Sequence, residues 1–288
     1  GLGDVYKRQA HCRWFFYTPA AVPFGMAKLA PSTDAHLGNP GGWQAVGYDF
    51  RHTSIEGFAN FHEFQVGGIV FAPTVGKLQT VPGELNEPDS GYRSRFDKKD
   101  EIAAPGWYSV FLKDYGVKAE LTAMQRVGFH RYTYPKSEQA NLIFDIGNKQ
   151  GESGEVKDAE VQYFDDGRVE GYVVTSPVYV NIYQKGADVR MYFSAVLNKK
   201  PVAVGTFVKN EVTPGKYREK GPGTGLYMTF STEDQEPVEV KVGLSYTSIE
   251  NARFNRETEA TDVAFDQAKK NATKVWNCLL YTSPSPRD

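Results

Sequence analysis

The first candidate for chemistry in this chain is an aromatic residue. Trp43 follows Gly42 in a stretch that is rich in glycine. An indole face packs well on the apolar C–H face of a pyranose ring, because ligand sites combine aromatic walls with a few polar groups. The pattern therefore makes Trp43 a candidate for binding sugar. A tryptophan buried in a core or at a domain interface explains the same pattern.

A polar pair follows about twenty residues later. His62 can donate a hydrogen bond to a sugar hydroxyl, and Glu63 can accept one. The alternative is a structural pair whose members are bonded to each other. Neither residue has the spacing to other ligand types that a metal site requires, so we expect no metal site here.

Acidic residues that could cleave a glycosidic bond are scarce. Inverting hydrolysis needs two carboxyl groups about 6.5–9.5 Å apart, one protonated and one ionised. Asp165 and Asp166 precede Gly167 between two apolar runs, which favours a hairpin turn. Glu120 shares a strand face with Lys118 and Thr122, which indicates a solvated or interface edge. Neither Glu120 nor the Asp165–Asp166 pair is therefore a good catalytic candidate.

Composition limits the possible partners. The 288 residues carry a net charge of −2, so no basic field for nucleic acid is present. Of the two cysteines, Cys12 lies near one end and Cys278 near the other, which excludes a disulfide framework. No apolar run approaches the roughly 20 residues that span a membrane.

The elements that must position these residues are mainly strands. From about residue 107 onward apolar residues alternate with polar ones, separated by turns such as Pro214-Gly215, which predicts a sandwich or barrel. The expected strands contain Leu142, Phe144 and Ile146; Val178, Val180 and Ile182; Val189, Met191, Phe193 and Ala195; Leu226, Met228 and Phe230; and Val238, Val240, Val242 and Leu244.

Two regions depart from this period of two. Residues 19–105 are rich in Gly, Pro, Asn and Asp, and we expect long ordered loops there, carried by the sheet. After Leu244 the period becomes that of a helix. Ser248 can cap a first helix through Arg256, and Thr261 or Asp262 a second one with an apolar face. The second helix presents Phe265, Ala268, Ala272, Val275 and Trp276 on that face.

Both ends of the chain differ from the rest. Read back into codons, residues 1–9 and 278–288 spell one sequencing-library adaptor in opposite orientations. We therefore expect these residues to be artefacts and the chain to be a fragment cut at both ends.

Several motifs together resemble one known family, the amino-terminal domain of glycoside hydrolase family 92, the calcium-dependent exo-acting α-mannosidases. Their order and spacing match over almost all of residues 10–277. The motifs are Pro23–Met26, Leu29–Pro31, Gly42–Trp43, Gly47–Tyr48, Pro105–Val110, Asp114–Ala123, Arg126–Tyr132 and Gly243–Tyr246. The chain departs from the family at residues 59–65, where many members carry a stretch rich in His and Gly.

The resemblance implies an all-β fold, a galactose-mutarotase-like β-sandwich (supersandwich) followed by the start of a helical linker. The implied domains are the sandwich at residues 10–247 and the linker at 248–277, which leads to an absent (α/α) toroid. In the family the catalytic carboxylates and most calcium ligands belong to that toroid, so calcium is expected only in the complete enzyme. The sandwich contributes the aromatic residue of the Gly-Trp motif, here Trp43, beside the sugar.

The implied function is that of the N-terminal domain of an inverting exo-α-mannosidase that acts on mannose-containing glycans and is periplasmic or secreted. The partner of this domain is then the C-terminal catalytic domain of the same chain, and the fragment alone is expected to be inactive. Two alternatives stay open. One is a non-catalytic carbohydrate-binding or interdomain scaffolding module. The other is a mutarotase-type epimerase, which needs a histidine and a carboxylate that converge on the concave face of the sheet.

Overall fold

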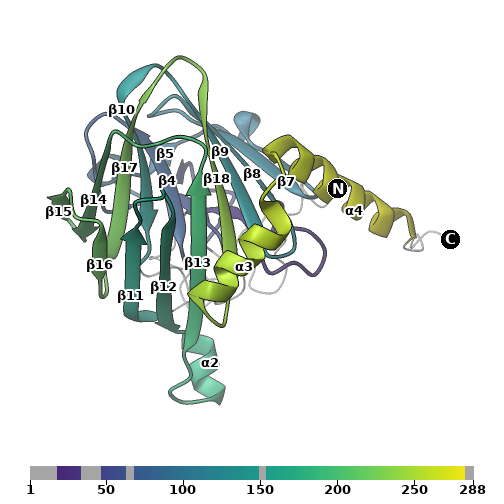
Figure 1. Ribbon diagram of the computed structural model, residues 1–288. Coiled ribbons are helices and arrows are strands. Elements are labelled where there is room, and N and C mark those ends of the chain that lie inside the picture. Colours follow the sequence, from purple (N-terminus) through teal and green to yellow (C-terminus); the bar gives the residue numbers. More distant parts are fainter. Residues whose placement is uncertain (1–17, 34–46, 63–67, 149–153, 283–288) are drawn as a thin grey trace.

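The computed structural model describes residues 18–33, 47–62, 68–148 and 154–282. Two large antiparallel sheets face each other, and the helices lie outside them (Figure 1). The all-β sandwich predicted from the sequence is thus confirmed. Among the described helices, none has the length and apolar character needed to span a membrane.

The first sheet has seven strands. Its order is β1 (Ala30–Ser32), β3 (Gly57–Ala59), β4 (Val70–Val75), β10 (Ser137–Asp145), β17 (Thr224–Thr232), β14 (Ala203–Val208) and β15 (Glu211–Pro214). Three of these strands come from residues 19–105, where the sequence predicted loops. Short runs such as residues 68–72 form strands there because β10 supplies the backbone partners, with Asp145 opposite Val70.

The second sheet has nine strands. Its order is β16 (Arg218–Lys220), β11 (Glu155–Tyr163), β12 (Val169–Ser176), β13 (Val189–Leu197), β18 (Glu236–Ser245), β9 (Val127–Tyr134), β8 (Val117–Ala123), β7 (Trp107–Leu112) and β6 (Ile102–Ala104). A small third sheet pairs β2 (Ser54–Ile55) with β5 (Ser94–Arg95). Two short 3₁₀ helices, η1 (Pro88–Ser90) and η2 (Lys98–Asp100), flank β5.

The core lies between the two large sheets. Phe71 of β4 and Phe144 of β10 belong to the first sheet, and their ring centroids are 4.0 Å apart. Phe71 also faces Phe193 of β13, in the second sheet, at 6.4 Å. The alternation read from the sequence is confirmed here, because Val238, Val240, Val242 and Leu244 of β18 are all buried.

One predicted strand is wrong. Residues 178–182 belong to α2 (Val178–Tyr183), a short helix that projects from the end of the sandwich between β12 and β13 (Figure 1). The Asn181 side chain closes this connection, since it donates to the Pro177 and Ala187 carbonyls and accepts from the Gly186 amide. An alternating run forms a strand only where a neighbouring strand pairs with it, and none of the described strands lies beside α2.

Two helices cover the outer face of the nine-stranded sheet. Ser248 caps α3 (Ile249–Ala260) by accepting from the Asn251 amide, as predicted. The helix lies directly on β18, where a Cβ added to Gly243 would come within 2.1 Å of the Ala252 carbonyl oxygen. Only glycine permits this close approach.

The second helix, α4 (Phe265–Thr282), lies over β7, β8 and β9. Of the predicted apolar face, Phe265, Ala268 and Ala272 are buried, whereas Val275 is 44% exposed. The cap predicted at Thr261 or Asp262 is wrong, because the helix begins at Phe265. The Thr261 hydroxyl instead donates to the Glu257 carbonyl at the end of α3.

Candidate functional site

The residues singled out for sugar binding lie at or beside segments that the structure does not describe. Trp43 falls within residues 34–46 and Glu63 within 63–67, so both are outside the described residues, and their roles stay predictions. His62 and the residues that flank these segments are described. The described residues that border these segments therefore define the candidate site.

The two ends of the Trp43 segment meet at Thr33 and Gly47. The Thr33 amide donates to the Gly47 carbonyl at 2.6 Å, and the Thr33 hydroxyl reaches the same oxygen at 3.1 Å. Gly47 has φ +78°, a value that favours glycine. The Gly-Tyr motif of the sequence thus forms one side of a clamped loop base.

The Thr33 hydroxyl organises the residues that follow the loop. It accepts from the Asp49 amide at 3.0 Å and lies 3.0 Å from His52 Nδ1. Asp49 is buried and holds Arg51 through two nitrogens. Burial opposes ionisation of Asp49, but hydrogen bonds from Arg51 outweigh it and lower the Asp49 pKa.

A buried arginine connects Thr33, at the base of the loop, with two other segments of the chain. Arg93 is 3% exposed and donates to the Thr33 carbonyl and to Ser54 Oγ, the latter at 2.8 Å. Its third contact is the Gly83 carbonyl at 3.3 Å. A guanidinium reaches these three acceptors from three separate nitrogens, whereas a lysine has a single nitrogen.

Two buried carboxylates complete the framework. Glu56 Oε1 accepts from Ser32 Oγ at 2.8 Å, next to the Trp43 segment. Asp145 Oδ2 accepts from the Tyr92 hydroxyl at 2.5 Å and from the side-chain amide Nδ2 of Asn148. Burial, and then the charge of Asp145, raises the Tyr92 pKa well above its ordinary value. Tyr92 therefore stays protonated and acts as a donor.

These contacts link residues that border two of the undescribed segments. Tyr92 and Arg93 are adjacent and connect Asp145 and Asn148 with Thr33. β1 and β3 are antiparallel, so Thr33, which follows β1, and His62, which follows β3, lie at opposite ends of this strand pair.

His62 is enclosed. It is 2% exposed, its amide donates to the Lys28 carbonyl at 2.9 Å, and its carbonyl accepts from Thr18 Oγ1 at 2.9 Å. This backbone pairing fixes the point where residues 63–67 begin. The predicted contact between the His62 ring and a sugar stays a prediction.

Glu56, Tyr92, Arg93 and Asp145 were missed in the sequence. The available signal was a charged residue inside an apolar run, since Glu56 lies between Ile55 and Gly57 and Asp145 between Phe144 and Ile146. Burial of such a charge requires partners that hold it in place. The partners come from distant residues, so the pattern alone does not identify them.

A buried histidine on β9 also has a structural role. His130 and Tyr132 share a strand face, and His130 lies between the Tyr132 hydroxyl and Asn60 Oδ1, at 2.8 Å from each. Asn60 Nδ2 donates to the Ile69 carbonyl, so its Oδ1 accepts from His130 Nε2. Burial lowers the His130 pKa to about 3, which keeps the ring neutral. Arg126, just before β9, forms an ion pair with Glu259 of α3.

The acidic candidates also have structural roles. Asp166 lies in the β11–β12 hairpin and binds Arg168 at 2.7 Å, as the turn pattern predicted. Glu120 is 7% exposed and lies on β8, between β7 and β9, with Lys118 at 3.3 Å. Among the described residues no group of three His, Cys, Asp or Glu could hold a metal ion. The described donor set therefore does not fit a calcium ion.

A family model and several solved structures match this chain. A family model described as the glycosyl hydrolase family 92 N-terminal domain matches residues 9–245. A family GH92 α-mannosidase from Bacteroides thetaiotaomicron superposes with a TM-score of 0.83 at 27% identity, over 96% of this chain. Its structure with mannoimidazole gives the same TM-score and identity over 97% of this chain. No curated protein matches the sequence.

An inverting family GH92 mannosidase from the same species gives a TM-score of 0.74 at 20% identity, over 94% of this chain and 34% of its own, and shows a shared fold. The chain spans only 37% of the length of the first mannosidase. The match over residues 9–245 covers most of the chain and includes both sheets. This chain therefore belongs to glycosyl hydrolase family 92, of which it carries the N-terminal domain.

Proposed function

We propose that this chain is the N-terminal domain of an exo-acting, inverting α-mannosidase that degrades mannose-containing glycans and is exported to the periplasm or the medium. The observation that carries the proposal is the superposition of 96% of the chain on a family GH92 α-mannosidase, together with the family match. The binding of mannoimidazole by that relative supports a mannose-type ligand.

In this proposal the catalytic carboxylates and the calcium ligands belong to a catalytic domain outside this chain. One observation supports that division. The buried carboxylates of the framework, Glu56 and Asp145, bond to Ser32 and Tyr92 and so hold loops in place.

The sandwich has two tasks in this proposal. It supports the catalytic domain, and it presents Trp43, from the loop base at Thr33 and Gly47, together with His62 and Glu63 to the sugar. The clamp at Thr33 and Gly47 supports the second task, because a rigid loop base lowers the entropy lost when an aromatic side chain orders against a ligand.

A scaffolding module that never touches sugar is the second candidate. The enclosed His62, at 2% exposure, favours it, since a buried ring is a poor partner for a ligand. A mutarotase-type epimerase has less support, because among the described residues the His130 ring is bonded to Tyr132 and Asn60 rather than to a carboxylate.

The test compares this chain with the complete protein encoded by the source DNA. With calcium and an aryl α-mannoside, we expect saturable turnover by the complete protein and none by residues 10–277. Proton NMR at early times should show β-mannose released first. Turnover by the chain alone overturns the division of labour, and failure of the complete protein on any α-mannoside overturns the function.

A further inference from the structure

A cavity lies on the outer face of the nine-stranded sheet. It has a volume of about 260 Å³ and lies between β13, β18 and the C-terminal end of α3. Its polar lining comes from Arg256, Lys241, Asn198, Glu239 and Thr261. Pockets for drug-sized ligands have volumes of about 300–1,000 Å³, so this cavity suits a smaller ligand.

The charge that faces this cavity is a buried arginine. Arg256 is 9% exposed, so its guanidinium has lost most of its water. Among the described residues its contacts are long: Nε to Ser194 Oγ at 3.4 Å and Nη2 to Glu257 at 3.3 Å. A guanidinium has five N–H donors, so most of its hydrogen-bonding capacity is left over. Burial lowers the Arg256 pKa, which reflects this poor compensation.

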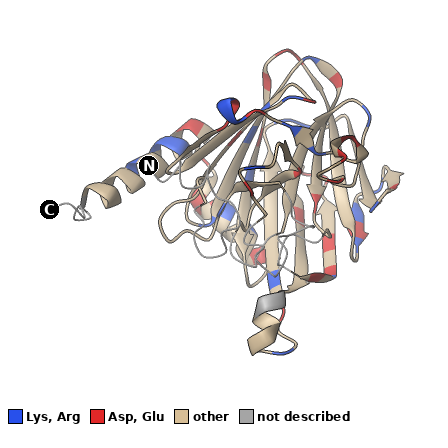
Figure 2. Ribbon diagram, turned by 180° about the vertical axis from the view of Figure 1, so that it is seen from behind, with Lys and Arg blue, Asp and Glu red and all other residues tan. Residues whose placement is uncertain are grey.

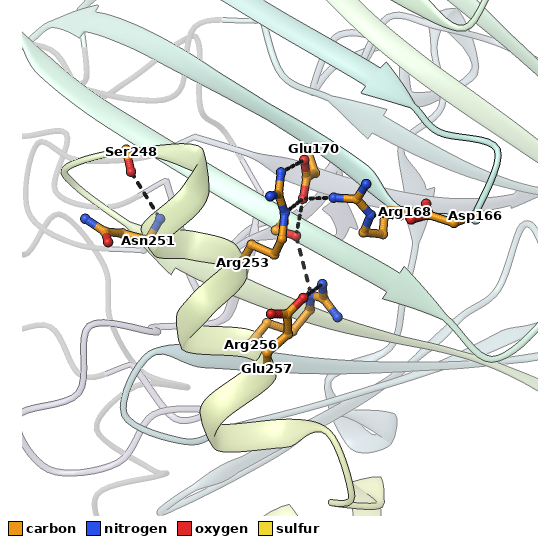
Figure 3. A network of polar contacts seen from close by, with 9 residues as sticks. Asp166, Arg168, Glu170, Ser248, Asn251, Arg253, Arg256 and Glu257 are labelled. Atoms are coloured by element: carbon orange, nitrogen blue, oxygen red, sulfur yellow. Dashed lines mark hydrogen bonds and ion pairs between the residues drawn. The ribbon is translucent and has the colours of Figure 1, made fainter.

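The buried carboxylate of Glu170 is bonded to other partners. Glu170 of β12 accepts two bonds of 2.7 Å from Arg253, one of 3.0 Å from Arg168 and one of 2.8 Å from Ser194 (Figure 3). Among the described residues, the hydrogen bond of Arg256 to this cluster is the long one to Ser194. Its own acid, Glu257, has a side chain that is 55% exposed, so water screens the pair.

A second cation lies at the same cavity. Lys241 Nζ donates to the Ala260 and Thr261 carbonyls at 2.9 and 3.2 Å, at the end of α3. An ammonium group has three donors, so one remains after these two bonds. Glu239 also lines the cavity, but Arg131 holds its carboxylate at 2.8 Å. The unbalanced charge in the lining is therefore positive.

We propose that this cavity binds an oxyanion of the phosphate class, either free phosphate or the phosphate group of a small sugar phosphate, through Arg256 and Lys241. A guanidinium fork matches the oxygens of a phosphate, and a buried positive charge gains most from such a partner because the local dielectric constant is low. Nothing in this inference depends on the proposed mannosidase activity.

The test is a titration of the whole chain at constant ionic strength. Inorganic phosphate and mannose 6-phosphate are each added, and binding is followed by calorimetry and by the thermal unfolding midpoint, with sodium chloride as the ionic control. We expect saturable binding and a rising midpoint with phosphate but not with chloride. Tighter binding of mannose 6-phosphate identifies a sugar phosphate as the ligand, whereas equal or weaker binding identifies free phosphate.

Variants show whether the bound phosphate occupies this cavity. Arg256→Met and Lys241→Met should each weaken binding by about tenfold or more, a readily measured change in Kd. Arg256→Lys keeps the charge but loses the fork, so it should bind with intermediate affinity even if Arg256→Met folds poorly. Arg218→Met is the matched control, because Arg218 lies on β16 with its side chain 63% exposed and should bind as the unmodified chain does.

Two results overturn the proposal. One is the absence of saturable phosphate binding to the unmodified chain. The other is a Kd that Arg256→Lys and Lys241→Met leave unchanged, which would mean that phosphate binds elsewhere.

Discussion

At the scale of single residues, buried polar groups of the core bond to partners both near and far in the sequence. His130 shows this most clearly, because its two ring nitrogens meet Tyr132 on its own strand and Asn60 of the facing sheet end. The sequence shows a histidine in an alternating strand, which suits either a site or a core. The two bonds and complete burial make it a core histidine.

This burial predicts an acid dependence of stability. The His130 pKa is about 3 in the folded chain, against the ordinary value of 6.5 for an exposed histidine. The unfolded chain therefore binds a proton that the folded chain does not, and the free energy of unfolding falls as the pH drops from about 6.5 toward 3. The slope from this residue is at most about 1.4 kcal/mol per pH unit.

His130→Gln removes that titration. The free energy of unfolding of the unmodified chain and of the variant is measured in urea at pH 7.5, 6 and 5. The difference between the two should shrink as the pH falls below the unfolded pKa of about 6.5, toward the folded pKa of about 3. A difference that stays constant with pH would mean that His130 has the same pKa in the folded and the unfolded chain.

The role of Trp43 is tested in the complete protein. Trp43→Ala should raise KM for an aryl α-mannoside by about tenfold, the equivalent of about 1.4 kcal/mol, because a stacked ring is lost. Trp43→Phe keeps a ring and should retain part of the affinity. If Trp43→Ala leaves both binding and turnover unchanged, the residue is structural.

At the scale of elements, α3 is held to the sheet by a close approach and a charge cluster. Gly243 lets the helix backbone touch β18, and Glu170 holds Arg253 with two bonds of 2.7 Å. Burial raises the Glu170 pKa, but the bonds from Arg253 and Ser194 outweigh it and leave the pKa lowered. The ionised form of Glu170 therefore contributes to the docking of the helix.

Glu170→Gln should lower the free energy of unfolding by about 1–3 kcal/mol, because hydrogen bonds to a buried charge are lost while Arg253 can turn to water. Glu160→Gln is a matched control on the adjacent strand β11. Its partner Arg218 is exposed, so the expected loss is about 1 kcal/mol or less. Equal losses for the two variants, measured by urea unfolding, would contradict a special role of Glu170.

At the scale of the whole molecule, both sheets share one core and both C-terminal helices rest on one of them. Acidic and basic residues are interspersed over the strands and loops (Figure 2), in keeping with the small net charge. Several contacts hold the α4 helix against the sandwich, two of which involve tryptophans. Trp276 Nε1 donates to the Ala21 carbonyl at 2.7 Å, and Lys269 Nζ lies 3.3 Å from the centroid of the Trp107 ring.

This docking predicts that α4 unfolds together with the sandwich. Tryptophan emission and far-UV circular dichroism should change at the same urea concentration, as they do in a cooperative transition. Trp276→Phe isolates the contribution of the helix, since the difference between the two emission curves reports on Trp276. A difference that disappears at lower urea than the strand signal would show that α4 is a separate unit.

How far the sequence predicts this structure depends on the length and partners of each element. The long alternating strands β13, β17 and β18 and the Ser248 cap are confirmed, because a period of two and a capping residue act locally. The run at residues 178–182 carries the same alternation but lies between Ser176 and Val189, where strand pairing has ended, and it forms α2. The second helix begins at Phe265, later than the predicted cap allows.

The sequence by itself determined that this chain is a β-rich sandwich with helices at its C-terminal end, and its motifs indicated the family. Only the tertiary structure showed that Glu56, Tyr92, Arg93 and Asp145 form one framework around the loop bases. It also revealed a poorly compensated Arg256 beside a cavity. The physical reason is that periodicity depends on near neighbours, whereas the energy of a buried charge depends on groups that only the folded chain brings into contact.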